Sequence, residues 1–160
     1  MQVRYLPSFG LLERQVQIPR DDRAYLLSAS NDFTAAWQAF LAAAGGGSDQ
    51  VLSLNVSASK FPNWSRGKTI TITGLTALAS SQLPGNFVLR PEAPLPTTDV
   101  TLNPIAGVSE PNVVSGTIAP PPGSPGTWAL KLRAASAGDF HSLTAEDVGD
   151  LLLLIAFSVT

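Results

Sequence analysis

The sequence predicts a mainly β protein, an antiparallel β-sandwich with one amphipathic helix at about 31–44 and a short helical turn at about 144–149. Two observations predict this fold. Short segments in which apolar and polar residues alternate recur along the chain, as in strands that bury one face. They are separated by loops rich in glycine and proline, of which the 160 residues contain 13 each. Short strands at such spacing are typical of a sandwich.

The clearest alternation lies in two segments, 51–57 and 69–73. In both of them aliphatic residues alternate with serine, asparagine or threonine, so we expect half-buried strands. A turn or short excursion containing Pro62 and Gly67 should join them, because both residues interrupt regular structure. Further β-like segments are expected at Leu75–Ala79, Phe87–Arg90, Val100–Leu102, Val113–Ala119, Thr127–Ala134 and Leu151–Val159.

The last of these segments differs from the others. Leu151–Phe157 has no polar residue in alternation, so both faces of this strand should be covered and the strand should lie centrally in its sheet. Immediately before it, Thr144 can cap a short helical turn, and Glu146 and Asp147 suit the positive N-terminal end of such a turn.

One segment shows a helical period. Its aromatic and aliphatic residues are spaced by three, four and one positions, which predicts an amphipathic helix. Asn31 or Asp32 can cap its N-terminus, and the glycines at 45–47 can end it. We expect the apolar stripe to pack on the core. The stripe consists of Phe33, Trp37, Phe40, Leu41 and Ala44.

The composition bounds the class of function. With 44% hydrophobic residues the chain can bury a core, and we expect a single β-sandwich-like domain over residues 1–160. The formal charge of −2 gives no general attraction to nucleic acid or anionic lipid. The chain has no cysteine and one histidine, so we expect no metal site and no cofactor.

Neither a signal peptide nor a membrane-spanning segment is evident in the sequence. The longest apolar run, Leu151–Phe157, is far below the roughly 20 residues that cross a bilayer. We expect synthesis in the cytoplasm, with any export as part of a larger assembly.

The strongest candidate for a binding surface combines two aromatic and two basic side chains: Phe61, Trp64, Arg66 and Lys68. Tryptophan and arginine are frequent anchors at protein interfaces, and a cation beside an aromatic ring can also stack on a sugar. The alternative is that Phe61 and Trp64 plug the open end of the sandwich, while Arg66 and Lys68 keep the turn in water.

Motifs of known enzymes are incomplete. The segment 46–50 begins like the nucleophile elbow of a serine hydrolase but lacks the closing glycine. Asp139 and His141 could supply two metal ligands, yet no further histidine completes a site. The adjacent acids at 21–22 and 146–147 are more typical of turns and helix starts than of a glycosidase pair. We expect no enzyme activity.

The closing segment Leu143–Val159, with the preceding strand Gly126–Leu132, resembles the end of the A subunit of bacterial Tc (toxin complex) insecticidal toxins. In that family a Trp-bearing strand precedes a short turn and a final strand rich in aspartate, leucine and isoleucine. The segment Leu54–Leu78, with Phe61-Pro62 before Arg66-Gly67-Lys68, also resembles toxin-associated relatives of that domain. The resemblance implies a β-sandwich-like module that binds the B subunit of a larger translocation machine and has no enzyme activity.

We therefore expect a non-enzymatic protein–protein assembly module whose partner is a larger protein subunit of a toxin-like assembly. The first alternative is a carbohydrate-binding β-sandwich module that uses Phe61, Trp64 and the cations beside them. The second is a small hydrolase, which would need two carboxyl groups converging within roughly 5 to 10 Å.

Overall fold

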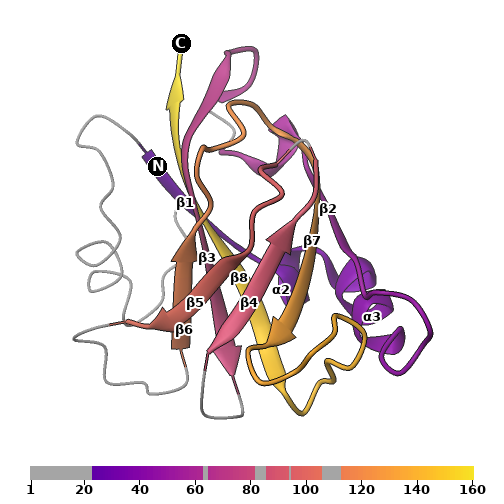
Figure 1. The fold of residues 1–160 in the computed structure, drawn as a ribbon. Coiled ribbons are helices and arrows are strands. Elements are labelled where there is room, and N and C mark those ends of the chain that lie inside the picture. Colours follow the sequence, from indigo (N-terminus) through magenta and orange to yellow (C-terminus); the bar gives the residue numbers. More distant parts are fainter. Residues whose placement is uncertain (1–22, 63–64, 82–85, 94, 106–112) are drawn as a thin grey trace.

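The protein is described by a computed structural model covering residues 23–62, 65–81, 86–93, 95–105 and 113–160. Within these residues the fold is mainly β and antiparallel, as predicted (Figure 1). The strands are β1 (Arg23–Ser28), β2 (Leu52–Val56), β3 (Ile70–Ser81), β4 (Phe87–Pro91), β5 (Val100–Pro104), β6 (Val113–Thr117), β7 (Gly126–Ala134) and β8 (Val148–Val159). The helices are α2 (Ala29–Asp32), α3 (Thr34–Ala42) and the 3₁₀ helix η1 (Ala58–Lys60).

The eight strands form one sheet in the order β1-β8-β3-β6-β5-β4-β7-β2. The sheet is curled, so that its two halves enclose a common core (Figure 1). A sandwich of two separate sheets is therefore not confirmed. The segment β1-α2-α3-β2 leads from one edge strand of the sheet to the other, and the helices lie beside β8 and β2.

The alternation in β2 and β7 places apolar side chains in this core. Leu54 and Val56 are fully buried, whereas the intervening Ser53 and Asn55 are exposed. Trp128 in β7 lies directly opposite Leu54 and is also buried. The half-buried strands predicted from the period of two are therefore confirmed here.

β8 is a central strand, as its uninterrupted apolar run predicts. It pairs with β1 on one side and with β3 on the other. Ile155 and Phe157 belong to the main core, while Leu154 belongs to a smaller cluster with Leu26 and other residues. Both faces of β8 are thus covered, which explains why no polar alternation is present.

β1 was not predicted, and the predicted strands at 69–73 and 75–79 are one strand. They join in β3 through Gly74, where the register against β8 shifts by a β-bulge. A Cβ atom at Gly74 would lie 3.3 Å from the Cβ of Ala156, so the two strands approach closely at this point. β2 and β3 are not neighbours in the sheet although they are consecutive in the chain.

The predicted helix at about 31–44 is divided into α2 and α3 at Phe33. The cap is Ser28, whose hydroxyl accepts a hydrogen bond from the backbone N–H of Asn31 (3.2 Å), and not Asn31 or Asp32 as predicted. The predicted apolar stripe does face the core, where the rings of Trp37 and Phe40 are stacked with centroids 5.6 Å apart. None of the helices in the described part of the chain is long and apolar enough to span a membrane.

The segment expected to be helical at about 144–149 forms a turn at 145–147, and β8 begins directly after it at Val148. Thr144 was predicted to cap the turn, but its side chain donates a hydrogen bond here and does not accept one. The carboxylate of Asp147 accepts hydrogen bonds from the backbone N–H (2.8 Å) and the hydroxyl (3.0 Å) of Thr144. The turn ends at residue 147 because the next residue, Val148, already pairs with Ser81 in β3.

Candidate functional site

Several strand ends meet at one end of the curled sheet. β3 begins with Ile70 opposite Val159, near the end of β8, and β1 begins with Arg23 opposite Phe157. Just beyond β3 and β8, the backbones of residues 69 and 160 exchange two hydrogen bonds of 2.9 and 3.0 Å. This end of the sheet therefore provides a well-ordered backbone frame for the segment that leads into β3.

Phe61, the first of the predicted site residues, is a core residue. Only 4% of it is exposed, and its ring makes an edge contact with Phe157 at a centroid distance of 5.0 Å. On the other side it lies 6.2 Å from the ring of Tyr25. A buried ring cannot contact a partner at the surface, so this position fits the alternative in which Phe61 fills the end of the core. Trp64 lies outside the described residues.

Arg66 and Lys68, in contrast, are exposed. A tight turn brings the chain from the core to the surface, because both the backbone N–H and the hydroxyl of Ser65 donate to the carbonyl of Pro62 at 2.9 and 2.6 Å. Gly67 follows with a φ of 75°, a left-handed conformation that glycine adopts without strain. Two of the predicted site residues, Arg66 and Lys68, are thus exposed at this end of the sheet, with Gly67 between them in the chain.

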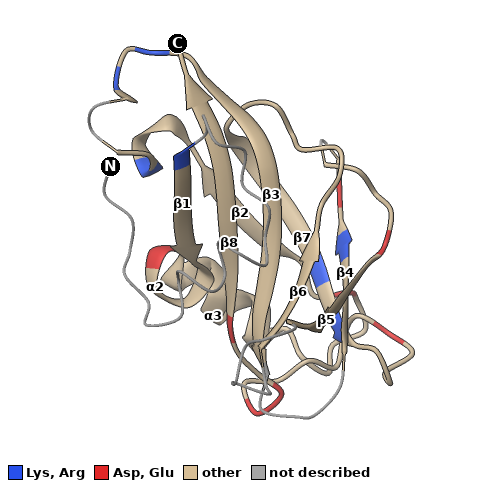
Figure 2. Ribbon diagram, turned by 90° about the vertical axis from the view of Figure 1, so that its left-hand side faces the viewer, with Lys and Arg blue, Asp and Glu red and all other residues tan. Residues whose placement is uncertain are grey.

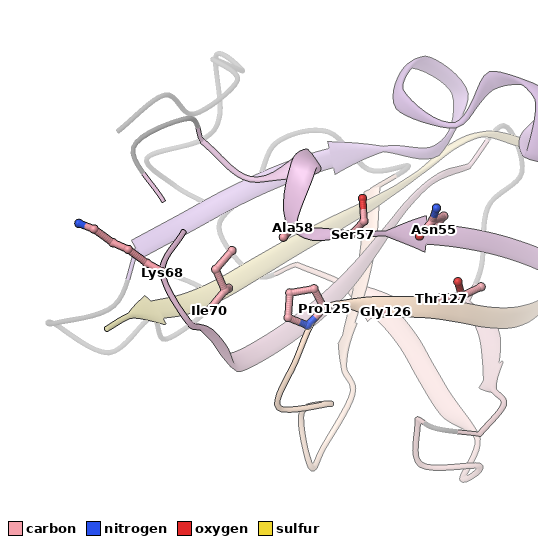
Figure 3. A pocket seen from close by; sticks show the side chains of 8 residues that line it. All are labelled: Asn55, Ser57, Ala58, Lys68, Ile70, Pro125, Gly126 and Thr127. Atoms are coloured by element: carbon pink, nitrogen blue, oxygen red, sulfur yellow. The ribbon is translucent and has the colours of Figure 1, made fainter. Parts of the chain in front are cut away.

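A pocket of about 410 Å³ lies next to Lys68 (Figure 3). Its middle is apolar and contains Ile70 and Pro125, while Asn55 and Thr127 lie at one end and Lys68 at the other. The ammonium group of Lys68 points outward at the rim. The pocket is lined by Asn55, Ser57, Ala58, Lys68, Ile70, Pro125, Gly126 and Thr127.

The other lining residues of this pocket were not predicted as site residues from the sequence. They come from β2 and the segment directly after it, from the first residue of β3, and from the loop before β7 and the start of β7. Asn55 belongs to the exposed phase of the β2 alternation, and Pro125 to a proline-rich loop, and these two signals mark surface positions. The pairing of β2 with β7, which brings them together, joins residues 70 to 78 positions apart and has no local signal.

The described charged side chains at this end are all basic. We call the exposed or half-exposed cations Arg23, Lys60, Arg66 and Lys68 the basic end. No aspartate or glutamate occurs in the described residues of segments 23–27, 56–70, 119–127 and 155–160, which form it. In Figure 2 one group of blue segments lies at this end and a second lies on β4 and β7, while the red segments lie at α2, beside β4 and toward the other end of the sheet. A protein with a net charge of −2 therefore has a local basic surface at this end.

The members of the basic end differ in their contacts. Lys60 donates to the backbone carbonyl of Asp32 at 3.2 Å and lies 4.8 Å above the ring of Phe33. The side chains of Arg66 and Lys68 form no hydrogen bond or ion pair with the described part of the protein. These two cations are consequently available to an external group.

Two cations on the outer face of β4 and β7, Arg90 and Lys131, already have acidic partners. Arg90 forms a two-pronged contact with Asp99 at 2.6 and 3.0 Å, and this hydrogen bonding raises the pKa of Arg90 and lowers the pKa of Asp99. Lys131 contacts both Asp49 and Glu92 at 3.0 Å, and these hydrogen bonds raise its pKa. The charges of Arg90 and Lys131 are therefore paired within the protein.

The single histidine lies beside an acidic side chain, with its Nδ1 3.6 Å from the carboxylate of Asp139. The carboxylate of Asp139 accepts a hydrogen bond from the backbone N–H of His141 (3.1 Å), and this bond, followed by one from the Ser142 hydroxyl, lowers the pKa of Asp139. Ser142 thus binds the carboxylate and not the imidazole, unlike a nucleophile and its base. Among the described residues no group of three potential metal ligands occurs.

The adjacent acids have structural surroundings where they are described. Glu146 and Asp147 lie in the turn before β8, and the Asp147 carboxylate is engaged by Thr144. The acids at 21–22 lie outside the described residues.

Fold and site together define an antiparallel β protein with a curled sheet and a basic end beside an open pocket. Comparisons with protein-family models, with curated proteins and with solved structures gave no match to this chain. The resemblance to the Tc A-subunit domain consequently stays a prediction from the sequence.

Proposed function

We propose that the protein is a non-enzymatic module that assembles with another protein, as the resemblance to the C-terminal domain of Tc toxin A subunits implies. The observation that supports this most is the basic end, where Arg66 and Lys68 are exposed and have no partner in the described part of the chain. Cations that a folded protein leaves unpaired and gathers in one place are suited to a partner of opposite charge.

The backbone around these cations favours binding without large rearrangement. Phe61 anchors the preceding segment in the core, and the hydrogen bonds between residues 69 and 160 hold the following one. Association then requires less ordering of the protein, so more of the contact energy contributes to affinity.

The test is assembly with a B-subunit-like propeller protein or with the product of a neighbouring gene. The two proteins are mixed at micromolar concentration and separated by size-exclusion chromatography. Co-elution with a shift to higher mass supports the proposal, and the complex should weaken as the salt concentration rises. If the protein elutes alone in every mixture, the proposal is wrong.

The alternative is a carbohydrate-binding module, and one observation favours it. The pocket carries an amide and two hydroxyl groups, from Asn55, Ser57 and Thr127, which can bind sugar hydroxyls. A glycan array tests this alternative, with Asn55→Ala and Trp64→Ala as variants. A blank array, or sugar binding that both variants leave intact, would remove it.

A further inference from the structure

We propose that the basic end binds an extended acidic segment of the partner protein. An apolar side chain of that segment occupies the pocket of Figure 3, and a neighbouring carboxylate contacts Lys68. This inference rests on the proposed function, because it states the chemistry of the surface that the partner presents.

The shape and lining of the pocket indicate an apolar side chain as its occupant. Ile70 and Pro125 form its middle, and Ala58 adds a third apolar contact. The volume of about 410 Å³ is within the size range of pockets that take small ligands and exceeds what one water needs. Apolar surface that a partner covers here contributes roughly 25 cal/mol per Å².

The polar residues at the end of the pocket opposite Lys68 suit a peptide. Asn55 and Thr127 lie opposite each other on β2 and β7, with exposed side chains that form no hydrogen bond with described residues. Their amide and hydroxyl groups can both donate to and accept from the backbone of an incoming segment. β2 is also an edge strand of the sheet, so an extended segment can lie alongside its backbone at this point.

The charge distribution selects acidic over basic segments. Lys68 is at the rim of the pocket and Arg66 is two residues away, while the described segments that form this end carry no acidic side chain. A carboxylate placed beside the pocket would meet basic side chains and no acidic side chain of these segments, and its approach would be accelerated by the same field.

Nucleic acid would also be attracted by cations, but the remaining features favour protein. The net charge of the chain is −2, and the ring of Phe61 is buried and cannot stack on a base. The apolar middle of the pocket has no counterpart in phosphate recognition.

The experiment uses the ¹⁵N-labelled full chain and a terminally blocked peptide of alternating glutamate and leucine. Titration followed by NMR should shift the backbone amides of Asn55, Lys68 and Thr127 first. The same peptide with glutamine in place of glutamate serves as the uncharged control and should bind at least about fivefold more weakly. Raising the salt concentration should reduce the difference between the peptides.

Variants separate the charge from the pocket. Lys68→Glu should weaken binding of the acidic peptide about tenfold and improve binding of a peptide with lysine in place of glutamate. Lys131→Gln is the matched control, because that lysine is already held by Asp49 and Glu92, and it should leave binding unchanged. Thr127→Phe should fill the pocket and abolish binding without lowering the unfolding temperature.

In the peptide experiment, the inference is overturned by equal binding of the glutamate and glutamine peptides or by amide shifts confined to other surfaces. It is also overturned if a single-stranded oligonucleotide displaces the peptide at a concentration below that of the peptide. Co-elution with a partner protein that Lys68→Glu leaves unchanged would overturn this inference alone. Failure of every co-elution would overturn the proposed function, and the peptide titration would still decide the chemistry of the site.

Discussion

The side-chain amide of Gln50 forms two hydrogen bonds with the backbone of Leu143, 93 residues later in the chain. Its Nε2 donates to the Leu143 carbonyl at 2.9 Å, and its Oε1 accepts from the Leu143 N–H at 2.8 Å. Nε2 also donates to the carbonyl of Phe40 near the end of α3 at 2.8 Å. Gln50 is completely buried, so it connects the helix, the segment before β2 and the segment before β8.

Replacing Gln50 should therefore destabilise the protein. Gln50→Leu keeps the volume but leaves the Phe40 carbonyl and both backbone groups of Leu143 without their partner in a buried place. We expect the free energy of unfolding to fall by about 3 kcal/mol, measured by urea denaturation. Ser53→Ala, at an exposed position of β2, should change it by less than about 0.5 kcal/mol. Equal stability of the two variants would contradict this role of Gln50.

Phe61 offers a test of core against surface roles within the predicted site. Phe61→Ala removes a ring that contacts Phe157 and Tyr25, and we expect a loss of about 3 to 4 kcal/mol in the free energy of unfolding. Arg66→Ala, five residues later and exposed, should leave stability within about 0.5 kcal/mol. Thermal unfolding of both variants is the measurement. A stable Phe61→Ala variant would mean that the ring has no structural role.

Much of the fold is predictable from local patterns, because burial leaves a period in the sequence. β2 and β7 follow from alternation, and β8 from an apolar run that needs cover on both faces. The break of the predicted helix at Phe33 has no such signal. There the N–H of Phe33 closes α2 on Ala29 (3.1 Å), while its carbonyl accepts from Trp37 (2.9 Å) and begins α3.

Strand order and the pocket depend on pairing between distant residues. β1 pairs with β8, and β2 pairs with β7. The strand order and the curled form of the sheet therefore cannot be predicted from the pattern of any single segment. The exposure of Arg66 and Lys68 was predictable, since a proline and a glycine flank that turn. The neighbours that give Lys68 a pocket come from other strands, and that part of the site required the structure.

The ion pair between Arg90 and Asp99 predicts a change of stability with acid. Hydrogen bonding to Arg90 lowers the pKa of Asp99 in the folded protein. The stabilisation is thus complete above the pKa of the unfolded chain's aspartate, about 3.9, and is lost as the pH falls through the lower folded pKa. Asp99→Asn should therefore show a shallower loss of stability below about pH 4 than the unaltered protein. Because both side chains are partly exposed, the difference should shrink in high salt.

A side chain at Gly116 in β6 is expected to destabilise the protein. A Cβ atom built there would lie 2.7 Å from Cγ1 of Val100, 2.8 Å from Cδ2 of Leu102 and 2.9 Å from the carbonyl oxygen of Thr101. Relief of these contacts requires movement of the β5 backbone, since a carbonyl of that strand is among them. We expect Gly116→Ala to lower the free energy of unfolding by about 1 to 3 kcal/mol.

Gly138 provides the matched control for this substitution. No atom lies within 4 Å of a Cβ built at Gly138, and its φ is not in the left-handed region. Gly138→Ala should be neutral or stabilise the protein by up to about 1 kcal/mol, because alanine lowers the entropy of the unfolded chain. Urea denaturation of both variants measures the difference, and hydrogen exchange should localise the effect of Gly116→Ala to β5 and β6. Faster exchange throughout the sheet would instead indicate that β5 and β6 unfold together with the remaining strands.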